Sequence, residues 1–364
     1  MKTKIILPIL LLGLVVSCVN LIPSHPRISA RKAGRIHPIR EWELYSVIAI
    51  DWAADSKHFA VAGLNVYDGD EHSPNIFSYD IENPEVEWAN FTYGGLSLTY
   101  TPDGSAIAVP ELFGGANLLD AKTGMIIENI NDPVMEKGQC IGRMDIEYSP
   151  DSAKMITMDS DIKFGSSTTV FIWDTRKNEC LGKLLNEQGS SFDFEMSQDG
   201  KRLAIMLRDV PIFDAPGKAE YFGPQVQVWD LENRTKVCAF SGGNAAFDPG
   251  GKFIASADKD YNGEVNIWDA TSCALQYSLG RKGMDPFYGI SLAISPDGKL
   301  LAIGGSSAIQ IWNLANRKLL FESESLQNNV EILTFSPDGK YLISETVRVT
   351  KDDKAIITLW GVER

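Results

Sequence analysis

A single sequence phrase recurs seven times along this chain. In six copies, a tight-turn signal of the Ser-Pro-Asp-Gly type joins two apolar stretches, and its third position is Asp103, Asp151, Asp199, Gly250, Asp297 or Asp338. A degraded copy precedes them with Asp55 at that position, and successive copies are 41 to 51 residues apart. Repetition at this period predicts one repeat architecture rather than a series of unrelated domains.

A second marker counts the same units. Each unit ends in a short alternating stretch that closes on an aromatic or apolar residue, usually followed by Asp. The closing pairs are Tyr79-Asp80, Leu119-Asp120, Trp173-Asp174, Trp229-Asp230, Trp268-Asp269, Trp312-Asn313 and Trp360-Gly361. Two independent markers therefore give seven units, and the first unit matches both of them least well.

The physics of one unit indicates four antiparallel strands. Pro presets φ in the turn, Asp bonds back to the backbone, and Gly supplies positive φ, so the first two strands form a tight hairpin. Residues 291–294 and 300–303 are almost wholly apolar or small, residues 309–312 alternate, and residues 318–321 are more polar. Such units must close on one another to bury their faces. The sequence therefore predicts an all-β, seven-bladed β-propeller of four-stranded antiparallel blades.

The turn signals and Trp-Asp ends resemble those of the WD40-repeat family, over residues 36–364. This resemblance implies that an N-terminal strand, around Ile36 to Glu43, completes the last blade and closes the ring; Pro38 is acceptable in an outermost strand. WD40 units typically carry a Gly-His pair whose His bonds to the Trp. The four His of this chain, His25, His37, His58 and His72, do not follow Gly, so that His network is expected to be absent.

The N-terminus has the features of an export signal. Lys2 and Lys4 precede an apolar stretch of residues 5–16 that is too short to span a bilayer. It ends in Val-Val-Ser-Cys18, which resembles the lipobox of bacterial lipoproteins; an ordinary secretory signal is the alternative. We expect residues 1–17 to be a signal peptide, Cys18 to be lipidated, residues 18–35 to be a flexible tether and residues 36–364 to form the propeller. The protein would then be exported and lipid-anchored to a bacterial membrane, in the periplasm or on the outer surface.

Charge and cysteine content narrow the function classes. The net charge is −14, and an acidic chain is a poor partner for nucleic acid, which needs clustered Lys and Arg. Cys140, Cys180, Cys238 and Cys273 remain outside the signal. Most of them follow the closing pair of a different unit, so we expect separate outer strands and mostly free thiols. A monomer without a cofactor is expected.

Catalytic motifs are scarce. Residues 138–142, Gly-Gln-Cys-Ile-Gly, have the shape of a nucleophile elbow but lead into a strand, and every His precedes residue 73. A calcium-loop pattern places oxygen ligands at Asp258, Asp260 and Asn262, but Asp269 at its twelfth position lies beyond a strand. A polar hairpin turn is the simpler interpretation, so no metal and no enzymatic activity are predicted.

Function in such a ring resides in its loops. Aromatic and Arg residues on exposed loops commonly anchor protein partners. The candidates for partner binding are Tyr67, Asp70, Arg208, Phe213, Tyr221, Phe222, Arg281, Phe287 and Tyr288. The sequence predicts a membrane-anchored scaffold for a protein or peptide. The alternative is an envelope enzyme or a small-ligand or sugar sensor that uses the central channel; carboxylates with raised pKa converging there would favour it.

Overall fold

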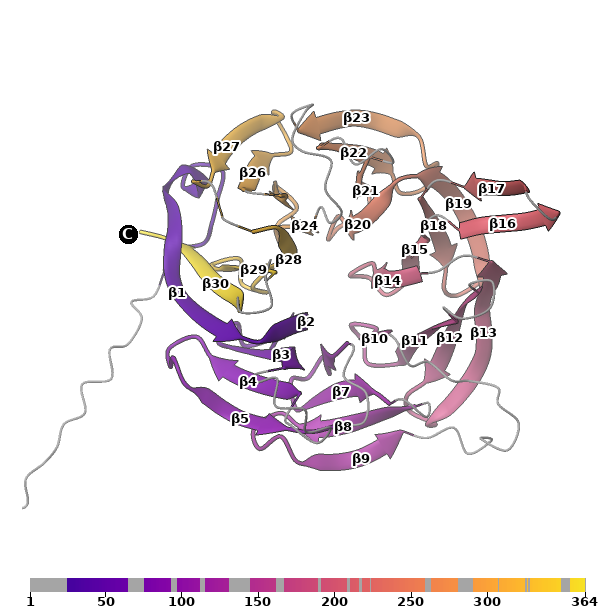
Figure 1. Ribbon diagram of the computed structural model, residues 1–364, viewed down its shortest axis with the longest axis horizontal. Helices are drawn as coiled ribbons and strands as arrows, with labels where there is room; N and C mark the ends of the chain where they lie inside the picture. Colours follow the sequence, from indigo (N-terminus) through magenta and orange to yellow (C-terminus); the bar gives the residue numbers. More distant parts are fainter. Residues whose placement is uncertain are drawn as a thin grey trace, which may run out of the picture.

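The computed structural model describes residues 25–64, 75–92, 97–111, 115–130, 145–161, 167–188, 191–207, 210–215, 218–222, 224–258, 263–280, 291–306, 308–324, 326, 328–347 and 354–363. Seven four-stranded antiparallel sheets stand around a common centre (Figure 1). This arrangement confirms the predicted seven-bladed propeller, including its first, weakest unit.

The first four blades follow the chain from the inside of the ring outward. Blade 1 contains β2 (Ser46–Trp52), β3 (His58–Leu64), β4 (Ile76–Asp80) and β5 (Val86–Asn90). Blade 2 contains β6 (Thr99–Tyr100), β7 (Ala106–Pro110), β8 (Ala116–Asp120) and β9 (Ile126–Ile130). Blade 3 contains β10 (Asp145–Tyr148), β11 (Lys154–Asp161), β12 (Ser167–Asp174) and β13 (Glu179–Gln188). Blade 4 contains β14 (Ser191–Met196), β15 (Arg202–Leu207), β18 (Gln225–Asp230) and β19 (Thr235–Ser241).

The remaining blades complete the circle. Blade 5 contains β20 (Gly243–Phe247), β21 (Phe253–Ala257), β22 (Glu264–Asp269) and β23 (Leu275–Gly280). Blade 6 contains β24 (Ser291–Ile294), β25 (Leu300–Gly304), β26 (Ile309–Asn313) and β27 (Lys318–Glu322). Blade 7 contains β28 (Val330–Phe335), β29 (Leu342–Thr346), β30 (Ala355–Val362) and, outermost, β1 (Ile36–Leu44).

The N-terminal strand closes the ring as predicted. The indigo β1 lies antiparallel to the yellow β30 (Figure 1), with Pro38 opposite Trp360 and an irregularity before Arg40. Pro38 is tolerated because β1 is the outermost strand of its blade, where proline is acceptable. The first and last parts of the propeller are thus held in one sheet.

The recurring turn is held by one side-chain arrangement. In blade 6, the Ser295 hydroxyl donates to Asp297 (2.8 Å) and accepts from the backbone N–H of Leu300 (2.9 Å). The same hydroxyl-to-Asp bond recurs at Thr101, Ser149, Ser197 and Ser336. Blade 5 has Asp248 at this position, and its carboxylate accepts from the Lys252 N–H instead.

The core lies between neighbouring blades. Side chains on facing sheets form seven buried clusters, such as the one of Trp42, Phe59, Tyr79 and Ile357 between blades 7 and 1. The closing Trp residues donate their indole N–H groups within their own blades. Trp173, Trp268 and Trp360 donate to Thr157, Ser256 and Ser344; Trp229 and Trp312 donate to Gln227 and Gln310. Hydroxyls and amides therefore occupy the place of the absent His network.

The end of the expected tether is packed against the ring. Ile28 and Ala33 are buried in the cluster between blades 6 and 7, and η1 (Ala33–Arg35) leads into β1. The Ile28 N–H donates to the Gly339 carbonyl, and the Arg27 side chain donates to the Asp338 carbonyl (both 2.8 Å). Residues 25–35 belong to the segment predicted as a flexible tether, and the apolar side chains of Ile28 and Ala33 are buried against the blades.

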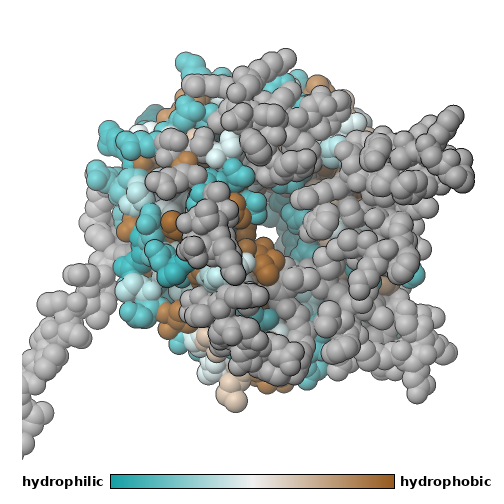
Figure 2. All heavy atoms as spheres, viewed as in Figure 1, coloured by the Kyte–Doolittle hydropathy of each residue, from teal (hydrophilic) through white to brown (hydrophobic). Residues whose placement is uncertain are grey.

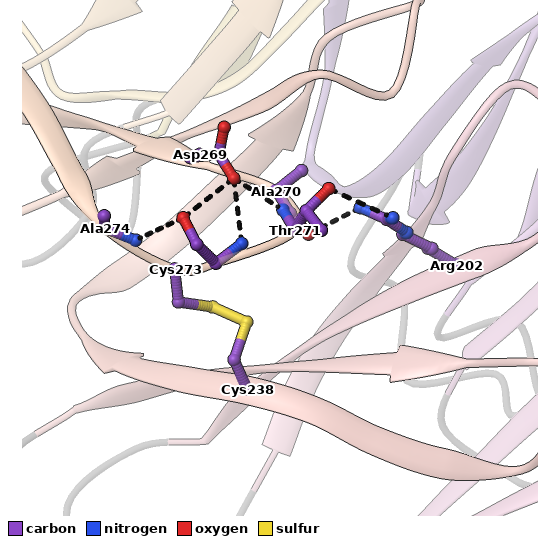
Figure 3. Close-up of a disulfide and its surroundings, with 8 residues drawn as sticks. Arg202, Cys238, Asp269, Ala270, Thr271, Cys273 and Ala274 are labelled. Atoms are coloured by element: carbon purple, nitrogen blue, oxygen red, sulfur yellow. Dashed lines mark hydrogen bonds between the residues drawn. A yellow bond between two sulfur atoms is a disulfide. The ribbon is translucent and has the colours of Figure 1, made fainter.

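The expectation of mostly free thiols is wrong. Cys238 on β19 and Cys273 in the turn after β22 form a disulfide between blades 4 and 5, with a Cα–Cα distance of 6.0 Å (Figure 3). Cys273 lies in a turn rather than on an outer strand, and this turn reaches the neighbouring blade. Cys180 is disulfide-bonded as well. Beside the first bond, Arg202 of blade 4 donates to the Ala270 carbonyl of blade 5.

Candidate functional site in the central channel

The innermost strands build the candidate site. β2, β6, β10, β14, β20, β24 and β28 are each the inner edge of a blade, so one side of each backbone faces the channel unpaired by any strand. Two adjoining cavities of about 480 and 580 Å³ lie along this channel, and they share Asp51, Asp193, Glu195 and Glu331 among their lining residues. Figure 2 shows the opening at the centre of the ring.

Carboxylates dominate the charge of this lining. Six acidic residues border the cavities: Asp51, Asp145, Glu147, Asp193, Glu195 and Glu331. Neither Lys nor Arg occurs among the described residues that line them. Asp193 and Glu331 are exposed, whereas the other four are half-buried. The ionisable side chains among the described lining residues are consequently all acidic, and the channel is open to solvent.

The half-buried carboxylates connect adjacent blades. Asp51 of blade 1 accepts from the backbone N–H of Tyr100 in blade 2 (2.7 Å). Glu147 of blade 3 accepts from the N–H of Met196 in blade 4 (2.9 Å). Glu195 likewise accepts from the Phe247 N–H in blade 5. These carboxylates accept hydrogen bonds from N–H groups on the channel side of the inner strands, where no neighbouring strand is available. This structural role is one reason for acidic residues at these positions.

Burial and crowding shift the titration of these acids. Burial raises the pKa of Asp51 and of Asp145 to about 6, and that of Glu195 to about 8. The pKa of Glu147 lies well above its usual value because of burial first, and then because of the nearby charges of Glu195 and Asp145. Each carboxyl still touches the channel, whose water moderates the effect. Part of the lining therefore exchanges protons near neutral pH.

One further acid lies behind the channel wall. Glu345 on β29 is 1% exposed, and neither carboxyl oxygen has a hydrogen-bond partner among the described residues. Burial raises its pKa to about 8, with a contribution from Glu331. The neutral acid is thus the stable form of Glu345 at neutral pH.

Most of the loop residues selected from sequence lie outside the described residues: Tyr67, Asp70, Arg208, Arg281, Phe287 and Tyr288, as do Cys18, Asp260 and Asn262. Phe213, Tyr221 and Phe222, which were predicted to lie in a loop, lie instead on a hairpin of β16 (Val210–Ala215) and β17 (Lys218–Phe222). This hairpin projects outward from blade 4 (Figure 1). Asp258 accepts a side-chain hydrogen bond from Asn266 (3.2 Å).

The channel acids were not selected from sequence, although a signal was present. Asp145 and Glu147 alternate with apolar residues in the short β10, and Asp193 and Glu195 do the same in β14. In a strand that is the inner edge of a propeller, such alternation directs one set of side chains toward one face. Because the first strand of each unit lines the channel, this alternation marks Asp145, Glu147, Asp193 and Glu195 as channel residues.

The family model that this chain matches in part describes WD repeats, in agreement with the observed propeller. Residues 225–269 and 287–313 match the family model "WD domain, G-beta repeat". The chain is 23% identical over 288 residues, 75% of its length, to the "Transcriptional corepressor LEUNIG_HOMOLOG" of Arabidopsis thaliana. It is 34% identical over 84 residues, 22% of its length, to "MST50-interacting protein 11" of Pyricularia oryzae and to "Small ribosomal subunit protein RACK1" of Neurospora crassa.

These alignments span 31% of the corepressor and 25% of each of the other two relatives. The matched repeats and the seven-bladed ring together make this chain similar to WD40-repeat β-propellers.

Proposed function

We propose that this WD40-repeat propeller is a non-catalytic scaffold that docks a protein or peptide partner through a basic segment at its central channel. One observation carries the proposal: six acidic side chains line the channel, with no Lys or Arg among the described lining residues. A cationic side chain entering the channel would meet acids from blades 1, 3, 4 and 7. Complementary charge of this kind favours association and selects partners.

The relatives supply independent support. The name of MST50-interacting protein 11 describes an interaction with another protein, and the name of the Arabidopsis relative describes a corepressor. WD40 propellers typically bind proteins, and their rigid rings present loops and a channel mouth as docking surfaces. The acidic lining adds to this general role a preference for a positively charged partner.

A direct test compares peptides that differ only in charge. The full-length protein in detergent would be titrated with a fluorescent Lys/Arg-rich peptide and with the same peptide carrying Gln at those positions. We expect only the basic peptide to bind, with an affinity that falls as salt increases. Equal binding of both peptides would contradict the proposal.

A second test compares variants that lack acidic side chains inside the channel with variants that lack them elsewhere on the surface. Asp193 and Glu331 are exposed in the channel, so the double variant Asp193→Asn/Glu331→Gln should keep the fold and weaken binding roughly tenfold, or about 1.4 kcal/mol. The matched control Glu179→Gln/Glu232→Gln removes two exposed acids that do not line either cavity. Equal affinity of the two double variants would count against the channel as the docking site.

The raised pKa values of the channel carboxyls favour a second candidate function, a small-ligand or sugar site in the channel, with or without catalysis. Protonated and ionised carboxyls side by side can donate and accept hydrogen bonds to a polyol, or act as acid and base. A screen of neutral sugars by thermal shift separates the candidates. Stabilisation by a neutral sugar, abolished in Glu195→Gln, would support this function over the scaffold.

We propose that the protein is exported and anchored to a membrane through lipidated Cys18. The disulfide between Cys238 and Cys273 supports export, because such bonds persist in oxidising compartments. Among the described residues, no helix combines the length and hydrophobicity that a bilayer crossing requires. Cys18→Ser should move the protein from the membrane fraction to the soluble fraction, whereas unchanged retention in the membrane would refute the anchor.

A further inference from the structure

Three adjacent strands of blade 1 bring different ligand types to one end of the sheet. His58 is the first residue of β3 and lies directly opposite Asp80, the last residue of β4. Glu87 lies on the next strand, β5. One imidazole and two carboxylates therefore converge from positions that are 22 and 7 residues apart in sequence. None of these residues belongs to the channel site.

The three side chains are close enough to share one ion. One ligand atom from each of His58, Asp80 and Glu87 lies within 4.8 Å of the other two. The His58 Nε2 to Glu87 Oε1 distance is 3.6 Å. Zn²⁺ bonds of about 2.0–2.2 Å in a tetrahedral site require ligand separations of roughly 3.3 Å. Side-chain adjustments of about an ångström or less would close the set, and the side chains of His58 and Glu87 are 35% and 31% exposed.

Each of the three side chains is oriented by a hydrogen bond through one of its polar atoms, so that its other nitrogen or oxygen atom is left to bind the ion. His58 Nδ1 lies 2.6 Å from Asp55, whose other oxygen accepts the N–H groups of Lys57 and His58. This bond to Nδ1 fixes the ring with Nε2 toward Glu87, as carboxylates do for metal-binding His. Asp80 Oδ1 accepts the Glu82 N–H, and Glu87 Oε2 accepts the Ser78 hydroxyl.

The arrangement is peculiar to blade 1 and is not part of the repeat. His58 lies three positions after the third residue of its turn, and the residues at this position in the other blades are Ala106, Lys154, Arg202, Phe253, Leu300 and Tyr341. The residues seven positions after the closing pair, at the position of Glu87, are Ile127, Leu181, Val237, Gln276 and Leu320. A propeller blade therefore needs neither the His nor the Glu for its own folding.

The electrostatic environment at this end of blade 1 favours a cation. The carboxylates of Asp55, Asp80 and Glu87 surround the His58 imidazole, with Asp55 2.6 Å from Nδ1 and Glu87 3.6 Å from Nε2. The negative charge of these carboxylates attracts a metal ion, which would bind through Nε2.

We propose that His58, Asp80 and Glu87 bind a divalent transition-metal ion, with Asp55 as the positioning residue of the imidazole. A mixed nitrogen and oxygen ligand set without thiolate suits Zn²⁺ and its neighbours better than Ca²⁺, which takes oxygen ligands. Three protein ligands leave a fourth position for water or for a side chain from another molecule.

The test uses full-length protein freed of metal with a chelator and titrated calorimetrically with ZnCl₂. We expect one equivalent to bind to the wild type. Glu87→Gln keeps the shape of the side chain but removes its charge and should weaken binding at least tenfold, and His58→Gln should abolish it. Asp55→Asn should weaken it about 10–100-fold by releasing the imidazole. The control Glu85→Gln removes an exposed acid two residues away and should leave binding unchanged.

A spectroscopic readout identifies the ligands. Co²⁺ in place of zinc should give a d–d absorption band that is lost in His58→Gln. Thermal melting without metal establishes that each variant is folded. Absence of stoichiometric zinc binding, or equal affinities of Glu87→Gln and Glu85→Gln, would overturn the proposal and leave His58 as the hydrogen-bonded partner of Asp55.

Discussion

Glu147 of blade 3 accepts a hydrogen bond from the backbone N–H of Met196 in blade 4, 2.9 Å away across the boundary between the two blades. The inner strand of a blade has no further strand to pair with its channel side, so its N–H groups need other acceptors. Carboxylates from the preceding blade supply them. The ring thereby gains connections between blades, at the cost of confining acids close to one another.

This arrangement predicts an unfolding free energy that declines as pH rises above about 4. The folded-state pKa values of Asp51, Asp145 and Glu195 are about 6, 6 and 8, whereas the unfolded values are near 4. The folded state therefore holds more protons than the unfolded state between about pH 4 and 8, and the unfolding free energy falls as pH rises through this range. The melting temperature should be several degrees higher at pH 5.5 than at pH 8.

Acid loss of stability has a separate origin. The turn aspartates Asp103, Asp151, Asp199, Asp297 and Asp338 have lowered pKa values. Their stabilisation is present above the unfolded pKa and disappears as pH falls below about 4. Scanning calorimetry from pH 3 to 8.5 should thus show a maximum at about pH 4. A melting temperature that rises from pH 5.5 to 8 would contradict the assignment.

The variant Glu195→Gln isolates one contribution to this profile. The amide oxygen can still accept from the Phe247 N–H, but the side chain no longer ionises. Its melting temperature should therefore depend less on pH between 6 and 8 than that of the wild type, and should exceed it at pH 8. Glu232→Gln, which changes an exposed acid, should reproduce the wild-type slope.

The hydrogen bond from the Trp173 indole to Thr157 should contribute to stability, and the nearly isosteric variant Thr157→Val tests this. Trp173 is 1% exposed and donates to the Thr157 hydroxyl (2.9 Å), which is itself fully buried. Thr157→Val leaves the indole N–H without this acceptor, so the unfolding free energy should fall by about 1–3 kcal/mol. Denaturant unfolding measures it, with Thr235→Val on the exposed start of β19 as the control. Equal midpoints for the two variants would show that the bond adds no stability.

The repeated turn allows a similar test. Ser295 is 3% exposed, and its hydroxyl bridges the Asp297 carboxylate and the Leu300 N–H. Ser295→Ala should destabilise the protein by about 1–2 kcal/mol because the buried N–H loses its acceptor. Ser105→Ala changes an exposed serine in the corresponding turn of blade 2 and should cost at most about 0.5 kcal/mol. A loss at Ser295 no larger than at Ser105 would contradict this account of the turn.

The fold could be predicted from sequence because its determinants are local. The turn that contains Ser295 and Asp297 is determined by five consecutive residues. Its recurrence along the chain gives the number of blades. The inter-blade contacts of Glu147 and Met196 depend on how adjacent sheets approach, which no local pattern records. The convergence of His58, Asp80 and Glu87 similarly depends on the register of three strands.

The cysteines show the same limit. The expectation of free thiols assumed that Cys238 and Cys273 occupy separate outer strands. Cys273 instead lies in a turn with positive φ (53°), and the turn carries its thiol to β19 of the preceding blade. Spacing along the chain could not reveal this, because the approach is set by the packing of blades 4 and 5.

The bond between Cys238 and Cys273 should contribute substantially to stability. It closes a segment with a sequence separation of 35 residues, and constraining the unfolded chain in this way typically stabilises by about 2–4 kcal/mol. The double variant Cys238→Ala/Cys273→Ala should lose about that amount in denaturant unfolding without reductant.

Reductant supplies the matched comparison. It should lower the unfolding midpoint of the wild type by more than that of the double variant, whose remaining response reports the bond of Cys180. Identical midpoints for the wild type and the double variant without reductant would show that the bond adds nothing to the stability of the ring. Arg202 lies beside this disulfide and offers a further control. The variant Arg202→Lys changes the hydrogen bonds to Ala270 and Thr271 but leaves the disulfide intact. The response of this variant to reductant should therefore equal that of the wild type.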